Sequence, residues 1–214
     1  VVGDEAGTAI TTGAFNTALG YQTGDALTVG TRNVALGYAA LSSDTKGSKS
    51  VAVGINALYA QNFTSATDAF NTAVGTDAGA AVTTGTNNTL IGGLAGDAIT
   101  TGTSNTAVGY ASLTANTTAS NNVAVGLSTL QANTTGGQNV AVGASSLYTN
   151  TTGASNTAVG HQVLASSTTA SSNTGIGFEA LNANTTGSNN TAVGNAAGLS
   201  VTTGIKNTLI GSVS

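Results

Sequence analysis

The chain repeats one pattern of polar, small and aliphatic positions at a nearly constant period. A five-residue motif, N-T-A-V-G or a close variant, occurs twelve times, first at residues 16–20. Its closing glycines are 17 residues apart, except that 21 residues separate Gly54 from Gly75. Such a period is typical of proteins in which one structural unit stacks on the next. The motif glycines, including one that ends a truncated first copy, are Gly3, Gly20, Gly37, Gly54, Gly75, Gly92, Gly109, Gly126, Gly143, Gly160, Gly177, Gly194 and Gly211.

The motif itself predicts a short strand followed by a turn. Counting from the motif glycine as position zero, position +13 is Asn in eleven of twelve repeats, +14 is Thr or Val, +15 is mostly Ala and +16 is always aliphatic. β-Branched and aliphatic residues bounded by Asn and Gly favour this arrangement. Alternation places +14 and +16 on one face and +15 on the other. We expect +14 and +16 to face the interior, and the asparagines to hydrogen-bond along the stack.

A second pattern, T-T-G, recurs at positions +8 to +10, for example at residues 100–102. Threonine favours extended backbone and glycine permits positive φ, so this pattern predicts the end of a second strand and a corner. Positions +3 and +6 are mostly small, which indicates close packing there. Positions +1, +2 and +5 vary freely, as expected for side chains that meet solvent.

Positions +4 and +7 exchange one aliphatic side chain between them. Where +4 is glycine, +7 is aliphatic; where +4 is leucine, +7 is polar. Because close-packed interiors conserve volume, we expect both positions to reach the same interior slot. The first kind of pair is Gly7 with Ile10, Gly24 with Leu27, Gly79 with Val82, Gly96 with Ile99 and Gly198 with Val201. The second kind is Leu41 with Asp44, Leu113 with Asn116, Leu130 with Asn133, Leu147 with Asn150, Leu164 with Ser167 and Leu181 with Asn184.

These patterns predict an all-β fold. A 17-residue unit is too short for a pair of helices, and glycine and threonine are poor helix formers. We predict a β-solenoid or parallel β-roll in which residues 1–214 form a single repeat array of about twelve coils, stacked about 4.8 Å apart. A four-residue insertion between residues 59 and 70 should bulge from the rod. Since each coil buries few aliphatic side chains, we expect several chains to associate, as a homotrimer.

The composition excludes several classes of binding partner. Charged residues are only 6% of the chain, against about 25% in a typical protein, and the net charge is −4. Four basic residues cannot form a basic stripe, so we expect no nucleic-acid partner. The absence of cysteine excludes disulfides and cysteine metal sites. No apolar run approaches about 18 residues, so we expect no membrane insertion by this segment.

No group of residues indicates catalysis. His161 is the only histidine and has no acidic partner at ligand spacing. The eight acidic residues never share a register in adjacent repeats, so they predict neither a carboxylate pair nor a metal ladder. The glycines of residues 92–96 lack the G-K-[ST] of a phosphate loop. We therefore expect no enzyme, no catalytic, cofactor-binding or metal-binding residues, and no cofactor.

Aromatic side chains are the candidates for surface recognition, because aromatic rings stack on sugars. The alternative is that they are scattered surface aromatics without a role. The insertion has the same two interpretations, as a recognition loop or as a tolerated lengthening. The candidate residues are Tyr21, Tyr38, Tyr59, Phe63, Tyr110 and Tyr148.

The repeats resemble those of two groups of fibrous proteins. Residues 105–110 (NTAVGY) and 150–160 (NTTGASNTAVG) look like repeats of tail-fibre proteins from bacterial viruses, particularly marine ones. The N-x-A-[VI]-G core is similar to the head repeats of trimeric autotransporter adhesins, whose coils form left-handed parallel β-rolls in a three-chain bundle. The resemblance covers essentially the whole chain. It implies an extracellular or virion fibre that serves attachment.

Three hypotheses for the function follow. The leading one is a non-enzymatic structural and adhesive fibre segment, the shaft of a virion tail fibre or cell-surface adhesin, with a host-surface glycan or receptor as partner. The second is a self-assembling extracellular filament, because open strand edges recruit further strands. The third is an ice-binding solenoid whose flat threonine columns order water. The third requires position +14 to lie on an exposed plane, opposite to the inward orientation expected above.

Overall fold

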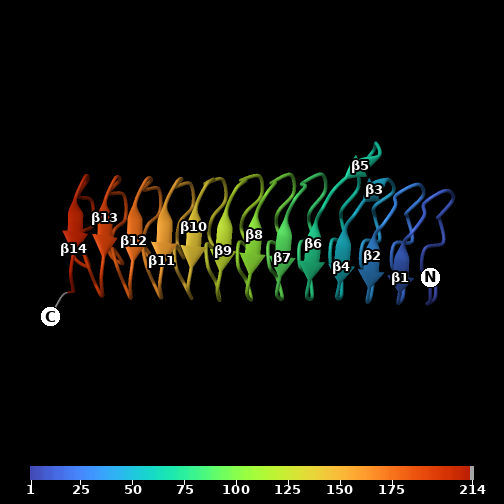
Figure 1. Cartoon of the computed structure of the whole chain (residues 1–214), viewed down its shortest axis with the longest axis horizontal. Helices are drawn as coiled ribbons and strands as arrows, with labels where there is room; N and C mark the ends of the chain where they lie inside the picture. The colour runs from blue at the N-terminus through green and yellow to red at the C-terminus, as the bar shows by residue number, and fades with distance from the viewer. Residues whose placement is uncertain (213–214) are drawn as a thin grey trace.

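The structure, a computed structural model, describes residues 1–212 of the chain. It is a parallel β-solenoid of about 11 turns with 17-residue coils, and one strand from each coil joins a single 12-stranded sheet (Figure 1). Residues 1–212 contain no helix, and none that could cross a membrane. The predicted all-β solenoid is confirmed. The strands of the sheet are β1 (Thr17–Leu19), β2 (Val34–Leu36), β4 (Val51–Val53), β6 (Thr72–Val74), β7 (Thr89–Ile91), β8 (Thr106–Val108), β9 (Val123–Val125), β10 (Val140–Val142), β11 (Thr157–Val159), β12 (Thr174–Ile176), β13 (Thr191–Val193) and β14 (Thr208–Ile210).

Equivalent residues of successive coils lie directly over one another. In the pairing of β8 with β9, Ala107 is opposite Ala124, and the same register holds across the insertion between β4 and β6. The backbone N–H of Thr106 donates to the carbonyl oxygen of Asn122 at 2.8 Å, and equivalent bonds recur from coil to coil. Each coil is therefore joined by backbone hydrogen bonds to the coils on both sides of it.

The orientation expected for the strand residues is wrong. The residue at +15, such as Ala107, is fully buried, whereas Thr106 and Val108 on either side of it are partly exposed. The reason is that the large interior side chain of each coil comes from position +4 or +7. The space beside the strand then admits only a small side chain, which alanine provides.

Exceptions at position +15 are compensated by their neighbours. Leu90 replaces alanine where position +4 is glycine, and a Cβ atom added at Gly96 would lie 2.8 Å from Leu90 Cδ2. Conversely, glycine replaces alanine at Gly175, in a coil where Val163 is larger than the usual residue at +3. A Cβ at Gly175 would lie 2.5 Å from Val163 Cγ1. Interior volume is therefore conserved within each coil and its neighbours.

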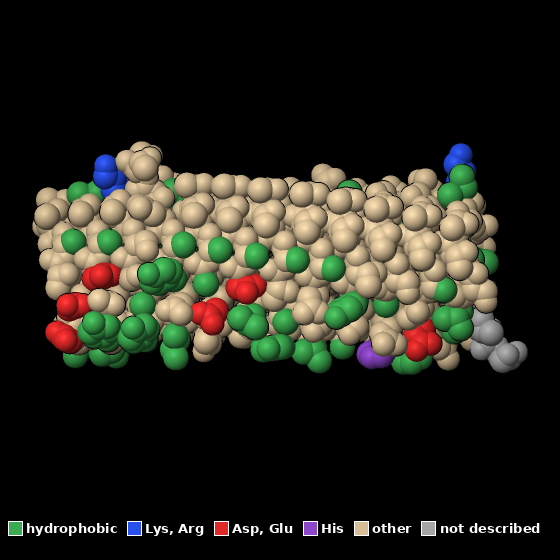
Figure 2. Space-filling view, turned by 180° about the vertical axis from the view of Figure 1, so that it is seen from behind, with side chains coloured by type: hydrophobic (Ala, Val, Ile, Leu, Met, Phe, Trp, Pro, Cys, Tyr) green, Lys and Arg blue, Asp and Glu red, His purple; other side chains and the backbone are tan. Residues whose placement is uncertain are grey.

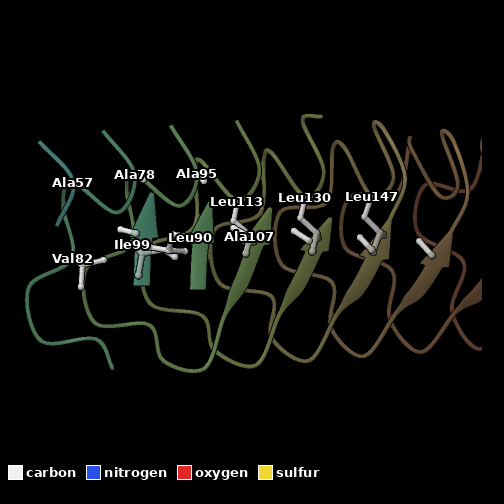
Figure 3. Packing of buried hydrophobic residues seen from close by; sticks show 14 of the residues in the cluster. Ala57, Ala78, Val82, Leu90, Ala95, Ile99, Ala107, Leu113, Leu130 and Leu147 are labelled. Atoms are coloured by element: carbon white, nitrogen blue, oxygen red, sulfur yellow. The ribbon is translucent and has the colours of Figure 1, made fainter. Parts of the chain in front are cut away.

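The exchange between +4 and +7 is confirmed as a shared interior slot. In Figure 3, Val82 and Ile99 enter the core from one side of the coil, while Leu113 and Leu130 enter from the other. A Cβ added at Gly96 would lie 2.8 Å from Ile99 Cδ1, so the two positions compete for one space. The result is a single continuous row of aliphatic side chains along the rod.

The T-T-G segment is a corner and does not end a second strand. Its backbone is bent, and the hydroxyl of the first threonine donates to the equivalent carbonyl of the next coil, as from Thr100 Oγ1 to the Thr117 oxygen at 3.1 Å. Threonine hydroxyls that bond to backbone in this way compete with strand pairing. Outside the main sheet, residues 1–212 form only the two-residue strands β3 (Gly47–Ser48) and β5 (Thr67–Asp68).

Backbone conformation explains the invariant motif glycine. Gly109 has φ of 132°, and a Cβ there would overlap the carbonyl group of Gly126 in the next coil. Positions +2, +4 and +12 also have positive φ, even where the residue is not glycine, as at Ala111 and Leu113 (both 55°). Each such residue costs about 1 kcal/mol of strain, which the stacking of the coils offsets.

The asparagines at +13 form the predicted ladder. The Asn105 backbone N–H donates to Asn88 Oδ1 at 3.0 Å, and Asn105 Nδ2 donates to the carbonyl of Ala119 at 2.9 Å. Both asparagines are fully buried. Their amides therefore satisfy corner carbonyls that the strands leave without partners.

Candidate binding surfaces

The outer face of the 12-stranded sheet is flat, regular and uncharged. Its two columns are position +14, with eight threonines and four valines, and position +16, with twelve aliphatic residues. The strands lie side by side without fanning (Figure 1), so neighbouring rows are about 4.8 Å apart. The face therefore presents alternating columns of hydroxyl or methyl groups and of larger aliphatic groups.

The threonine hydroxyls of this face have no hydrogen-bond partner among the described residues, which distinguishes them from the corner threonines at +8. Thr134 Oγ1, at +8, donates to the Thr151 carbonyl at 3.0 Å. Thr106, Thr157 and Thr174, at +14, make no such bond within residues 1–212 and point away from the core. The hydroxyls of the sheet threonines are thus free to bond with something outside the chain.

The five tyrosines are all exposed, by 40–58% of their surface. They lie on an edge beside the sheet, at position +1 (Tyr21, Tyr38 and Tyr110) or +5 (Tyr59 and Tyr148). Tyr21 and Tyr38 stack, with ring centroids 5.4 Å apart and planes inclined by 24°. The rod thus gathers tyrosines near its N-terminal end, while Tyr110 and Tyr148 stand apart.

Phe63 does not belong to a recognition surface, so that assignment was wrong. It is only 5% exposed, and a Cβ added at Gly47 would lie 2.9 Å from its ring. The lengthened coil opens a space beside Gly47, and the phenyl ring fills it. Phe63 therefore holds the insertion against the rod.

A groove lies between Tyr38 and Tyr59 and has a volume of about 350 Å³. Position +2 of four successive coils lines it, and the polar residues there are Gln22, Asn56 and Asp77, with Ala39 between the first two. Asn56 Nδ2 donates to Asp77 Oδ1 at 2.9 Å, which fixes both side chains. Sequence reasoning treated +2 as a variable solvent position and missed these residues. Their spacing in the sequence could have revealed them, because residues at the same position of different repeats lie on one face of the rod.

The surroundings of the groove are acidic. Nearby Glu5 is the main cause that raises the pKa of Tyr21, and desolvation, Tyr38 and Asp4 raise it further. Figure 2 shows hydrophobic side chains along most of the lower edge, with a group of acidic side chains among them at the N-terminal end, whereas basic side chains lie along the upper edge. The groove is therefore in a region of negative potential.

The insertion bulges from the rod as predicted, with β5 paired to β3 (Figure 1). Asp44 anchors it from the buried +7 position: it accepts bonds from the backbone N–H of Gly47 (2.9 Å) and of Phe63 (3.3 Å), and from Gln61 Nε2 (2.6 Å). On the surface, Lys49 Nζ is 2.6 Å from Asp68 Oδ2. The Asp44 carboxylate is thus occupied by structural bonds.

Among residues 1–212, no three His, Cys, Asp or Glu side chains group as a metal site would require. His161 is exposed and stacks on Phe178, with ring centroids 5.4 Å apart. The surfaces described above are the candidate sites of this chain.

Comparison with known proteins identifies no relative: the chain matches no family model, no curated protein and no solved structure. The resemblance to tail-fibre and adhesin repeats thus stays a prediction from the sequence.

Proposed function

We propose that this chain is a structural and adhesive segment of an extracellular or virion fibre, with no enzymatic activity. The observation that carries the proposal is the unbroken parallel register from Thr17 to Ile210, which includes the insertion. A rod built in this way places surface groups at fixed distances from its ends and resists bending, because each coil is hydrogen-bonded to two others. Those are the requirements of a fibre shaft.

The fibre is a homotrimer in this proposal, with the outer sheet face as the contact between copies. The aliphatic column at +16 runs along twelve strands, a strip about 50 Å long at about 4.8 Å per step. Continuous apolar strips of this size on soluble proteins mark interaction surfaces. The absence of charge in both columns removes the main obstacle to burial.

Sedimentation velocity and light scattering test the assembly. The parent chain is expected to sediment as an elongated trimer, and V108K/V125K/V142K, which places three charges on the sheet face, as a monomer. The matched control T101K/T118K/T135K carries the same charges on the exposed +9 positions of the same coils and should stay trimeric. A monomeric parent overturns the homotrimer, and an open-ended series of species supports the filament alternative instead.

A second candidate, ice binding, is favoured by one observation: the threonines at +14 point outward, on a flat uncharged plane, with hydroxyls that no described residue engages. Rigid rows of hydroxyl and methyl groups can hold water in a fixed lattice. The two candidates compete for one face, because copies packed there would cover the threonines.

Thermal hysteresis measurements test this candidate. If the face binds ice, the parent shows hysteresis, and T157Y/T174Y/T191Y loses it because the rings break the plane. The control T152Y/T169Y/T186Y, on the exposed +9 column of the same coils, retains it. A parent without hysteresis at millimolar concentration removes the candidate.

A further inference from the structure

We propose that the groove between Tyr38 and Tyr59 is a carbohydrate-binding site selective for neutral sugars. The assignment rests on the proposed attachment function and names the class of ligand that this segment would hold. It is carried by three features of the groove: two aromatic walls, a polar lining of fixed side chains, and the sign of the surrounding charge.

The aromatic walls come from two successive coils. Tyr38 is at position +1 of its coil, and Tyr59 is at +5 of the next, so their rings flank the +2 column between them. Tyrosine rings are flat and apolar with a hydroxyl at one end, and they stack on the apolar face of a pyranose. Along residues 1–212, aromatic residues occupy both of these wall positions only here.

The polar lining offers both acceptors and donors. Asn56 Nδ2 donates one hydrogen to Asp77, and Gln22 Nε2 donates one to Glu5 Oε2 at 2.6 Å. Asn56 Oδ1, Gln22 Oε1 and the second oxygen of Asp77 remain as acceptors, and each amide nitrogen keeps one further N–H. A ligand that fits must therefore both donate and accept hydrogen bonds, as the hydroxyls of a sugar do.

The surrounding charge sets the selectivity. Asp77 lines the groove, and Asp4 and Glu5 lie close enough to Tyr21 to raise its pKa. A ligand carboxylate or sulfate would meet this negative potential without a compensating cation. Arg32 and Lys49 lie at position +12 against Phe15 and Phe70, and Lys46 Nζ donates to the Thr64 carbonyl in the insertion. Sialylated, uronic-acid and sulfated sugars are therefore disfavoured, whereas neutral hexoses are accepted.

The site is shallow, so we expect weak binding by one chain. The volume of about 350 Å³ is near the lower end of about 300–1,000 Å³ for small-molecule sites. Three grooves on a trimeric rod would act together and raise the apparent affinity for a glycan-coated surface by about 10²–10⁴. Weak single sites on a multivalent fibre suit reversible attachment.

A glycan array that carries neutral, amino and acidic oligosaccharides, probed with the intact fluorescent chain, tests the proposal. We expect retention on neutral glycans, a loss of about tenfold in Y38A and in Y59A, and no change in Y148A. Tyr148 is an exposed +5 tyrosine like Tyr59, but Leu127 stands at the facing +1 position. Circular dichroism confirms that the variants fold.

Four outcomes overturn the site: no binding to neutral glycans, binding unaffected by Y38A and Y59A, stronger binding to acidic glycans, or binding that choline chloride displaces but free hexose does not. The last would assign the groove to cationic ligands. Sedimentation separates this failure from that of the fibre, because a trimer without glycan binding overturns the groove alone. A monomer that binds neutral glycans overturns the assembly and leaves the groove intact.

Discussion

The coils around the insertion and the regular coils from Gly109 to Gly160 fill the interior in the same way but close their corners differently. Both use leucine at +4. In the regular coils, asparagine at +7 closes its own corner, as where Asn133 Nδ2 donates to the Gly136 carbonyl at 2.9 Å. Near the insertion, Asp44 and Gln61 take this position, and Gln61 Nε2 donates to Asp44 Oδ2 of the preceding coil.

The difference shows which part of a coil can vary alone. The aliphatic filling is interchangeable, since leucine at +4 or isoleucine at +7 occupies the same space. The buried polar groups are matched between coils: Gln61 also donates to Ser50 Oγ and accepts from Asn71 Nδ2, and so replaces the ladder that Ser50 interrupts. A polar substitution in one coil therefore requires a partner in its neighbour.

The largest effect should come from a change common to both regions, at the motif glycine. Gly126→Ala places a Cβ against the carbonyl carbon of Gly143, at 2.8 Å, on a backbone with φ of 137°. We expect a loss of at least about 3 kcal/mol in the free energy of unfolding, measured by urea denaturation. Gly137→Ala, whose Cβ would meet only a carbonyl oxygen at 3.1 Å, is the control and should be nearly neutral. Equal losses in both would contradict the role of coil-to-coil contact.

In a regular coil, substitutions can remove the aliphatic side chain from the shared interior slot at +4 and supply another one from +7. Leu130→Ala should cost about 2–5 kcal/mol, because it leaves a cavity in the core. L130G/N133I copies the pairing of Gly96 with Ile99 and should recover part of that loss. Differential scanning calorimetry compares the three chains, and a double variant no more stable than Leu130→Ala would show that the two positions fill different spaces.

In the coil before the insertion, Asp44→Ala removes the acceptor for several buried donors. We expect a loss of about 3 kcal/mol, concentrated at the insertion, with faster proteolysis between residues 62 and 68. Asp44→Asn keeps one acceptor oxygen and should fall between the parent and Asp44→Ala. Cleavage of Asp44→Ala at sites in the regular coils before any cut in the insertion would contradict the local anchoring role of this carboxylate.

The smallest effect concerns the two +5 aspartates in coils that have glycine at +4. Burial raises the pKa of Asp25 and of Asp97, so folding disfavours the ionised forms of these carboxyl groups. The folded rod is therefore more stable when they are protonated, and that contribution to stability is lost as the pH rises through the raised pKa. Asp97→Asn should stabilise the rod by no more than about 0.5 kcal/mol at pH 7. The gain should vanish below the ordinary aspartate pKa, where both states are protonated. Thermal melts of both chains at pH 7 and pH 3 check this. An equal gain in stability at the two pH values would contradict burial of the ionised carboxylate as the cause.

Sequence reasoning predicted the repeat geometry because period, glycine and asparagine each constrain the backbone directly. It did not predict which face of the strand is buried, since alternation pairs +14 with +16 without saying which side is interior. The alanines at +15, read together with the leucines at +4, contained that answer. Phe63 was wrongly assigned to the surface, and the groove residues at +2 were missed, for another reason: the neighbours of Phe63 depend on the path of the lengthened coil, and those of the groove residues lie in other coils.

The insertion also bears on how such rods diversify. Four extra residues lengthen one corner while β4 and β6 on either side remain paired in register. A corner of such a rod can therefore be lengthened without any change in the pairing of the strands on either side. The length of one coil is in this respect independent of the register of the whole sheet.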